Sequence, residues 1–155
     1  MSIYEDVRPR KISPFRSIPI DDLEGCYAIE QACFGKEAWP REPFMQTLRE
    51  SAIMILFKNM KRDMILGFVT GRLFFSPKDE VCFYISFLEV LPEFQKKRIG
   101  TQLLGWLEDG LFHSGITKVF LNARAEVSAF YFKKGYSMSE RWSENLYEKK
   151  LAGGK

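Results

Sequence analysis

The chain of 155 residues has little of what metal sites and disulfide frameworks need. It contains one histidine, His113, and three cysteines, Cys26, Cys33 and Cys82, with no CxxC pair and no Cys/His ligand spacing. An odd number of cysteines cannot pair completely, so zinc and disulfide frameworks are both disfavoured. We therefore expect no metal, and buried thiols in a reducing compartment.

Long apolar runs and strong charge are also missing. No stretch approaches the roughly 18 continuous apolar residues of a membrane span, and MSIYEDVRPRK has no apolar signal-peptide core. We expect a cytoplasmic protein with no membrane partner. The net charge of +3 and the scattered basic residues do not indicate nucleic-acid binding. Neither GxxxxGK[ST] nor GxGxxG occurs, which disfavours a P-loop or dinucleotide fold.

What the chain does have is enough apolar material for a core. With 46% apolar and 15% aromatic residues, 155 residues suffice for one folded domain. No repeat, low-complexity block or linker divides the sequence. We expect a single domain over residues 1–155, with its core in residues 18–151 and short flexible termini.

Two helices are predicted near the N-terminus. Residues 19–34 carry apolar side chains at helical spacing, and Asp21 with Glu24 three residues on has the pattern of a capping box. Residues 42–51 begin with Pro43 close to a helix start and form the second, shorter helix. The loop between the two helices carries Trp39.

Three strands follow, rich in β-branched and aromatic residues. Residues 52–58 and 64–75 are separated by NMKRD, a connection of hairpin length, and residues 81–90 end just before Pro92. The first two of these strands are expected to be antiparallel neighbours.

The C-terminal half continues with alternating elements. A helix from Ile99 ends near Gly115, residues 116–122 form a strand, and a helix over 125–134 stops at Gly135. Two last strands are predicted over 136–141 and 146–150. The strand before Pro92, the helix and the strand after it form a βαβ crossover, so we expect an α+β domain with a mixed sheet.

The segment EFQKKRIGTQLL, residues 93–104, is a basic loop that leads into a helix. A helix N-terminus presents unpaired backbone N–H groups and the positive end of the helix dipole, which together favour a phosphate. Gln95 to Gly100 resembles motif A of the GNAT superfamily of acetyl-CoA-dependent N-acetyltransferases, in which Gln or Arg is followed by two variable residues, Gly, one variable residue, and Gly or Ala. In this chain Arg98 stands at the position of the first glycine.

The resemblance extends over nearly the whole chain, from about Ile18 to Leu151. NARAEVSAFYFKKGY is similar to the fifth strand and fourth helix of the family, and the N-terminal helix pair resembles that of the ribosomal-protein N-acetyltransferase branch. The resemblance implies the GNAT fold, an α/β sandwich-like arrangement with a mixed central sheet of about six to seven strands and about four helices. It also implies an acyltransferase with acetyl-CoA as acyl-donor cosubstrate.

The resemblance further implies where coenzyme A would bind. The backbone of one strand would bond the pantetheine arm, and the loop amides would hold the pyrophosphate. The residues implied are Leu88, Val90, Gln95, Lys96, Lys97, Arg98, Ile99, Gly100 and Thr101. Since only main-chain donors are needed, Arg98 replaces glycine without penalty if its φ is negative, whereas a positive φ costs about 1 kcal/mol.

Catalytic residues are also implied by the resemblance. Tyr131 stands where many family members place a tyrosine whose hydroxyl meets the coenzyme sulfur, which makes it the expected general acid. Spacing alone favours a core aromatic on an amphipathic helix. Asn122 occupies a position that is often Glu or His in relatives, and an amide cannot take up a proton at neutral pH, although it can hold a water. Glu89 and Tyr84 are the alternative bases, and either one is equally well explained as structural.

The acceptor is the least constrained part of the prediction. The segment CFGKEAWPREPF resembles the border of an acceptor groove, and Trp39 either walls that groove or is buried and pins the loop. We expect acetyl transfer to a primary amine, first a protein or peptide amine at an N-terminus or a lysine. A small-molecule amine and a catalytically weak acyl-CoA sensor remain alternatives. The protein would act as a monomer or a homodimer.

Overall fold

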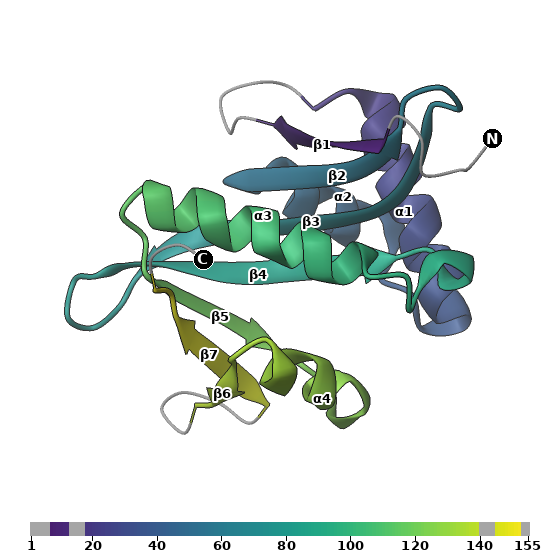
Figure 1. Cartoon of the computed structure of the whole chain (residues 1–155). Coiled ribbons are helices and arrows are strands. Elements are labelled where there is room, and N and C mark those ends of the chain that lie inside the picture. The colour runs from purple at the N-terminus through teal and green to yellow at the C-terminus, as the bar shows by residue number, and fades with distance from the viewer. Residues whose placement is uncertain (1–6, 13–17, 140–144, 153–155) are drawn as a thin grey trace. The chain divides into compact units, whose positions relative to one another are not determined.

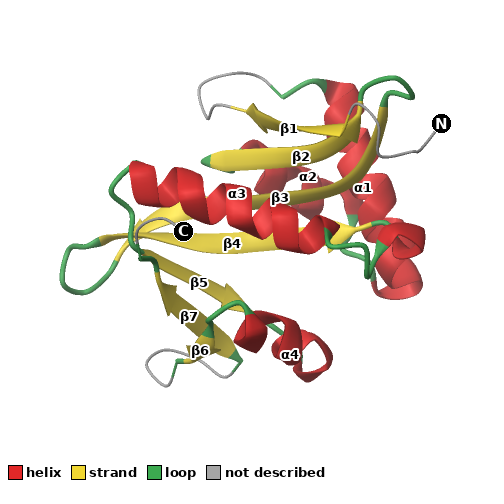
Figure 2. Ribbon diagram, in the orientation of Figure 1, coloured by secondary structure: helices red, strands yellow, loops and turns green. Residues whose placement is uncertain are grey.

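The computed structural model describes residues 7–12, 18–139 and 145–152. Within them the chain forms seven strands in one sheet, ordered β1-β2-β3-β4-β5-β7-β6, together with four α-helices. In chain order the elements are β1 Val7–Ile12, α1 Ile20–Phe34, α2 Arg41–Arg49, β2 Ile53–Asn59, β3 Met64–Phe75, β4 Val81–Val90, α3 Ile99–His113, β5 Lys118–Asn122, α4 Ala125–Lys133, β6 Ser137–Met138 and β7 Leu146–Lys150 (Figures 1 and 2).

Pairing makes the sheet mixed, as expected for the α+β class. Strands β1, β2 and β3 are antiparallel neighbours, whereas β4 and β5 pair in parallel around the crossover helix α3. The β4–β5 register joins Phe83 to Val119 and Tyr84 to Phe120. The last strand, β7, is antiparallel to both β5 and β6. The predicted hairpin and βαβ crossover are therefore confirmed.

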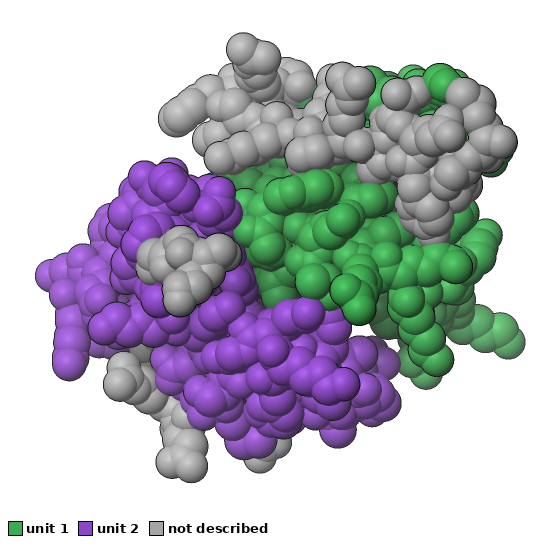
Figure 3. All heavy atoms as spheres, viewed as in Figure 1, with its two compact units in different colours: residues 1–72, 86–107 green, residues 73–85, 108–155 purple. Residues whose placement is uncertain are grey.

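The chain divides into two compact units (Figure 3). Unit 1 comprises residues 1–72 and 86–107, and unit 2 comprises residues 73–85 and 108–155. Strands β3 and β4 and helix α3 each contribute to both units.

Unit 1 holds helices on both faces of its strands. On one face, α1 and α2 pack against the sheet, and Phe44 of α2 lies 4.7 Å from Phe87 between ring centroids. On the opposite face, Trp106 of α3 stacks on Phe57 of β2 at 5.7 Å. The period of two along a strand sends alternate side chains to these two layers. Packing of helices against both faces of these strands holds the end of β4 and the start of α3 in place.

Close approach of β3 to β4 in unit 1 depends on Gly67. A Cβ added there would lie 2.9 Å from the carbonyl oxygen of Glu89 and 3.2 Å from a methyl carbon of Leu103. Real Cβ atoms do not come this close to backbone oxygen, so a side chain would push the two strands apart.

We expect Gly67→Ala to lower the free energy of unfolding by about 1–3 kcal/mol, because it overpacks a fixed backbone contact. Gly105→Ala is the matched control, since Gly105 lies in α3 with nothing within 4 Å of an added Cβ. Better helix propensity should make that variant more stable by about 0.8–1 kcal/mol. Urea unfolding of both variants measures the difference, and a Gly67→Ala protein as stable as the wild type would contradict the close approach.

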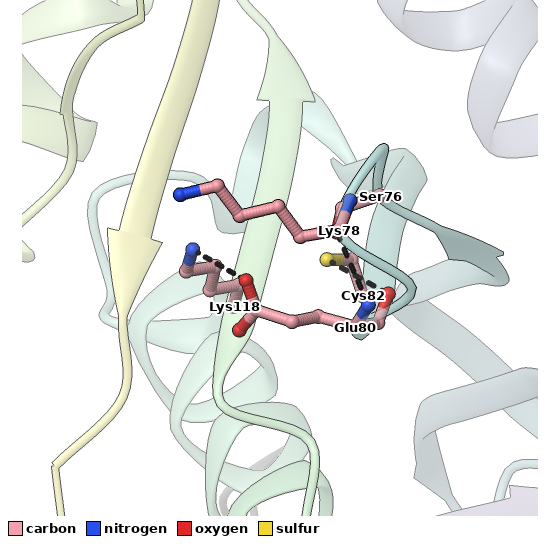
Figure 4. A network of polar contacts seen from close by, with 5 residues as sticks. All are labelled: Ser76, Lys78, Glu80, Cys82 and Lys118. Atoms are coloured by element: carbon pink, nitrogen blue, oxygen red, sulfur yellow. Dashed lines mark hydrogen bonds and ion pairs between the residues drawn. The ribbon is translucent and has the colours of Figure 1, made fainter.

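Unit 2 has its own small apolar cluster and a polar network at the β3–β4 turn. Cys82, Phe120 and Leu146 are buried together. At the turn, the Ser76 hydroxyl accepts hydrogen bonds from the N–H groups of Lys78 and Glu80, both at 3.2 Å. The Glu80 carboxylate is paired with Lys118 of β5 at 3.0 Å (Figure 4). The turn therefore sets the start of β4 beside β5.

Three details differ from the sequence prediction. Strand β1 was not predicted, because VRPRKI is polar and contains Pro9, which an edge strand tolerates. The capping-box prediction is wrong, since α1 begins at Ile20 after Pro19 without a side-chain cap, and Glu24 bonds instead to Arg41. Strand β6 covers Ser137–Met138, which is shorter than predicted, and residues 140–141 of that prediction lie outside the described residues.

Candidate active site

The loop between β4 and α3 has an unusual backbone. Lys96 and Arg98 both lie in the left-handed region, with φ values of 65° and 67°. Lys97 between them does not have a positive φ. Alternation in the sign of φ turns successive N–H groups toward one side, which is the backbone pattern of anion-binding nests. The side chains of Lys96, Lys97 and Arg98 are exposed. We expected Arg98 to replace glycine without an energetic penalty only if its φ were negative. Its φ is positive, so the penalty of about 1 kcal/mol applies.

The loop leads directly into the N-terminus of α3. The Arg98 carbonyl accepts the hydrogen bond of the Gln102 N–H at 3.0 Å, which places Arg98 at the helix cap. The amides of Ile99, Gly100 and Thr101 are then the first in the helix and have no intrahelical acceptor. Backbone donors and the helix dipole thus combine over residues 96–101.

Side chains fix the end of β4 beside this loop. The Val90 carbonyl accepts hydrogen bonds from the Gln95 side-chain amide at 3.0 Å and from the Cys33 thiol at 3.2 Å. The N–H of Leu91 donates to the Leu66 carbonyl of β3 at 2.9 Å. Because backbone direction alternates along a strand, Leu88 and Val90 direct their polar groups away from β3.

Glu89 lies on the opposite side of β4 from the α3 layer and is buried. The side chain of Glu30 in α1, which is also buried, lies near it. Burial, followed by the effect of Glu30, raises the pKa of Glu89 to about 10. At neutral pH Glu89 is therefore protonated, and in this state it cannot accept a proton from an amine.

Trp39 lies just before α2, and hydrogen bonds to its N–H and to its carbonyl hold its main chain in place. Its N–H donates to a Glu30 carboxylate oxygen at 2.8 Å, and its carbonyl accepts from the Tyr27 hydroxyl at 3.0 Å. The indole meets Phe87 edge to face at 5.0 Å, yet 45% of the residue is exposed. The buried alternative for Trp39 is therefore wrong.

Unit 2 contains the remaining predicted residues. The Tyr84 hydroxyl of β4 donates to the side-chain carbonyl of Asn122 in β5 at 2.5 Å. Tyr131 of α4 is buried, with its ring 5.6 Å from that of Tyr136, and burial raises its pKa to about 12. Tyr131 therefore keeps its hydroxyl proton at neutral pH.

The structure thus groups the predicted residues as follows. In unit 1 hydrogen bonds join the end of β4 to Gln95 of the loop, and Trp39 contacts β4 through the ring of Phe87. In unit 2 a hydrogen bond joins Tyr84 to Asn122 directly. Glu30 was missed by the sequence analysis, although a glutamate spaced four residues after Cys26 and three before Cys33 stands on the apolar face of its helix.

The described residues hold no group of three or more His, Cys, Asp and Glu side chains placed to bind a metal ion. Cys26 and Cys82 are buried free thiols, and Cys33 is a partly buried one. None of the helices in the described ranges has the length and apolar character to cross a membrane.

Comparison with known proteins assigns the fold. The sequence model described as "Acetyltransferase (GNAT) family" matches residues 23–136. A search of curated proteins finds no match.

Solved structures share the fold at low identity. An aminoglycoside 6'-N-acetyltransferase complexed with coenzyme A has a TM-score of 0.74 and 14% identity, over 96% of this chain and 99% of that one. The PaiA N-acetyltransferase of Thermoplasma acidophilum, in complex with coenzyme A, has a TM-score of 0.67 and 17% identity, over 94% and 99%. The ribosomal-protein-S18-alanine N-acetyltransferase of Escherichia coli has a TM-score of 0.69 and 18% identity, over 94% and 97%.

Proposed function

The chain belongs to the acetyltransferase (GNAT) family, and from this premise we propose that it transfers an acetyl group from acetyl-CoA to a primary amine, first of all that of a protein or peptide. The observation that carries the proposal is the nest at Lys96 and Arg98 in front of α3. A backbone of this shape suits an anion, and coenzyme A carries phosphates. We treat residues 1–155 as one such domain.

The loop supplies the phosphate contacts in this proposal. The amides of Lys97, Arg98, Ile99, Gly100 and Thr101 would hold the pyrophosphate, with the exposed ammonium of Lys96 adding charge. The Gln95 side chain already bonds to the Val90 carbonyl, so its role is to hold the strand end.

Strand β4 would supply the next contacts. The backbone groups of Leu88 and the N–H of Val90 point away from β3 and are suited to bond an extended arm as a further strand would, whereas the Val90 carbonyl already accepts from Gln95 and Cys33. When bound, acetyl-CoA supplies the activated acyl group. The Val90 N–H would then be a fixed donor to oxygen that gains negative charge, an interaction worth several kcal/mol.

We assign proton transfer to residues of unit 2. Tyr131 is the proposed general acid, since its hydroxyl is protonated at neutral pH and can donate to the departing thiol. Tyr84 donates its own proton to Asn122, so these two residues are proposed to hold the water that takes up the amine proton, and neither is the base itself. Glu89 loses that role in our proposal, because it already holds a proton.

Two alternatives remain for the acceptor and the activity. One structural neighbour is named for a ribosomal-protein alanine and another for an aminoglycoside, so the shared fold is compatible with a protein amine or a small-molecule amine. A weak enzyme that senses acyl-CoA is the other alternative, and the replacement of the first motif glycine by Arg98 is compatible with it.

The Arg98 backbone leads to a specific prediction. Arg98→Gly should leave the affinity for coenzyme A within about threefold, because the proposed contact is the main-chain amide, which glycine retains. The left-handed φ of 67° suits glycine, so stability should change by no more than about 1 kcal/mol. Calorimetric titration and urea unfolding give the two values. A loss of affinity of about tenfold or more would make the guanidinium a ligand contact.

Calorimetric titration with coenzyme A tests the proposed binding site itself. We expect binding that weakens with added salt, and much weaker binding of pantetheine, which lacks the phosphates. Lys96→Ala should reduce the affinity, whereas Lys61→Ala, in the β2–β3 turn, should not. Equal affinity for coenzyme A and pantetheine would contradict the phosphate cradle.

A further inference from the structure

In unit 2, a polar network joins α3, β7 and the connection from α4 to β6. Its members, here called the Glu108 network, are Glu108, Tyr136 and Lys149. The Tyr136 hydroxyl donates to Oε2 of Glu108 at 2.7 Å, and the Lys149 ammonium donates to Oε1 of Glu108 at 2.8 Å. The ammonium also lies 5.6 Å from the centre of the Tyr136 ring. Each member therefore contacts the other two, and each carboxylate oxygen has its own donor.

The Glu108 network is largely shielded from solvent. The side chains of Glu108 and Lys149 are 16% and 23% exposed, and Tyr136 is 2% exposed. Burial, followed by the charge of Glu108, raises the pKa of Tyr136 well above its ordinary value, so its hydroxyl remains a donor. Hydrogen bonds to a charged acceptor are shorter and stronger than neutral ones. The network therefore fixes the hydroxyl end of the Tyr136 ring.

Tyr136 is in turn joined to Tyr131 through the main chain and through the ring. The Tyr136 N–H donates to the Tyr131 carbonyl at 3.0 Å across the end of α4. Gly135, between α4 and Tyr136, has the left-handed φ of 94° that this kind of helix end needs. The two tyrosine rings meet edge to face with their centroids 5.6 Å apart. A shift of the Tyr136 ring would therefore move the ring of Tyr131.

Stability alone does not account well for a buried charged network at this place. A phenylalanine ring would fill the same space as Tyr136, and replacing buried charge networks by apolar side chains is often neutral or stabilising. A fully paired polar network instead specifies one arrangement, because each donor has its own acceptor. Catalytic side chains need such support, since a displacement of about 1 Å can lower a rate about 100-fold.

We propose that the Glu108 network sets the position of the Tyr131 ring and thereby places the Tyr131 hydroxyl beside the sulfur of the departing thiol. Glu108, Tyr136 and Lys149 are positioning residues, because they act through Tyr131. The link to catalysis rests on the proposed function, in which Tyr131 is the general acid. The hold of the network on the Tyr131 ring does not rest on it.

Fluorine NMR of the full-length protein labelled with 3-fluorotyrosine tests the hold on the ring. The chain has six tyrosines, and the signal that disappears in Tyr131→Phe belongs to Tyr131. Tyr136→Phe keeps the neighbouring ring and removes only its hydroxyl, and we expect it to displace the Tyr131 signal. Glu108→Ala should displace the signal as well. Glu108→Gln should restore it, because the amide oxygen still accepts a hydrogen bond from the Tyr136 hydroxyl.

Kinetics tests whether the network acts through the Tyr131 hydroxyl. We expect Tyr136→Phe to lower kcat about 10–100-fold and to change KM for acetyl-CoA by no more than about twofold, as displacement of a catalytic group predicts. In the Tyr131→Phe background, the same substitution should lower kcat by no more than about twofold, because the hydroxyl that it displaces is already absent. A merely structural role of Tyr136 would lower kcat equally in both backgrounds.

Two neighbouring lysines of β7 provide a matched control. Lys149 is paired with Glu108, whereas Lys150 is exposed. We expect Lys149→Met to lower kcat and Lys150→Met to leave it at the wild-type value.

Each part of the proposal can be overturned separately. An unmoved Tyr131 signal in folded Tyr136→Phe and Glu108→Ala proteins would overturn the hold on the ring. A wild-type kcat in Tyr136→Phe, or an equal loss of kcat in both backgrounds, would overturn the link to catalysis. Full turnover in Tyr131→Phe, or an inactive wild type, would overturn the proposed function instead, and the fluorine signal would still decide the hold on the ring.

Discussion

Tyr131→Phe should lower kcat by about 10²–10⁴-fold while leaving KM for acetyl-CoA nearly unchanged. The substitution removes only the hydroxyl, which burial keeps protonated at neutral pH by raising its pKa to about 12. If that proton is donated to the departing thiol, the chemical step slows and ground-state binding does not. Steady-state thiol release over a range of pH measures the effect.

The control for this experiment is Tyr147→Phe. Tyr147 is another buried tyrosine of unit 2, on β7, and has no assigned role in the reaction. Removal of the Tyr147 hydroxyl should change kcat by no more than about twofold relative to the wild type. If Tyr131→Phe retains the wild-type turnover at every pH, the general-acid assignment is wrong and Tyr131 serves only to pack against Tyr136.

The stability of the wild type should fall with rising pH relative to that of Glu89→Gln. In the folded protein burial, followed by the nearby Glu30, raises the pKa of Glu89 to about 10, from an ordinary value of 4.5. Between these values the folded state holds a proton that the unfolded state has released, so unfolding releases a proton. Protonation of Glu89 contributes fully to the free energy of unfolding at pH values below the pKa of Glu89 in the unfolded state. This contribution is lost as the pH rises to the pKa of Glu89 in the folded state, at up to about 1.4 kcal/mol per pH unit.

Urea unfolding at several pH values between 5 and 9 measures this difference. Glu89→Gln lacks the titrating group, so its advantage over the wild type should grow steadily with pH. Glu42→Gln, an exposed glutamate in α2, should follow the wild-type curve. If the free energy of unfolding of the wild type and of Glu89→Gln changed with pH in parallel, Glu89 would titrate as an ordinary carboxyl.

Most of the fold could be predicted from the sequence, because local signals agree with the tertiary arrangement. The bounds of β3, β4 and β7 match the predicted ranges, and Gly135 ends α4 with a φ of 94°. Apolar runs bounded by Pro92 or by turn residues decide these elements. Strand β1 has no such signal, since its place in the sheet is set by its partner β2.

The candidate site was predictable only where a motif carries it. Residues 95–100 could be found from their resemblance to a family, but the left-handed backbone at Arg98 could not, because arginine seldom adopts it. The pair of Glu30 and Glu89 joins residues 59 positions apart in the numbering, and nothing local indicates that two carboxyls will meet. The change in the expected role of Glu89 follows first from its burial and second from the nearby Glu30.

The most direct test of the central claim is thiol release from acetyl-CoA against a panel of peptide N-termini, peptide lysines and small amines. We predict release that requires both the protein and one acceptor class, with the acetylated amine identified by mass spectrometry. Binding of acetyl-CoA without acceptor-dependent release across the whole panel would contradict the claim and favour an acyl-CoA sensor.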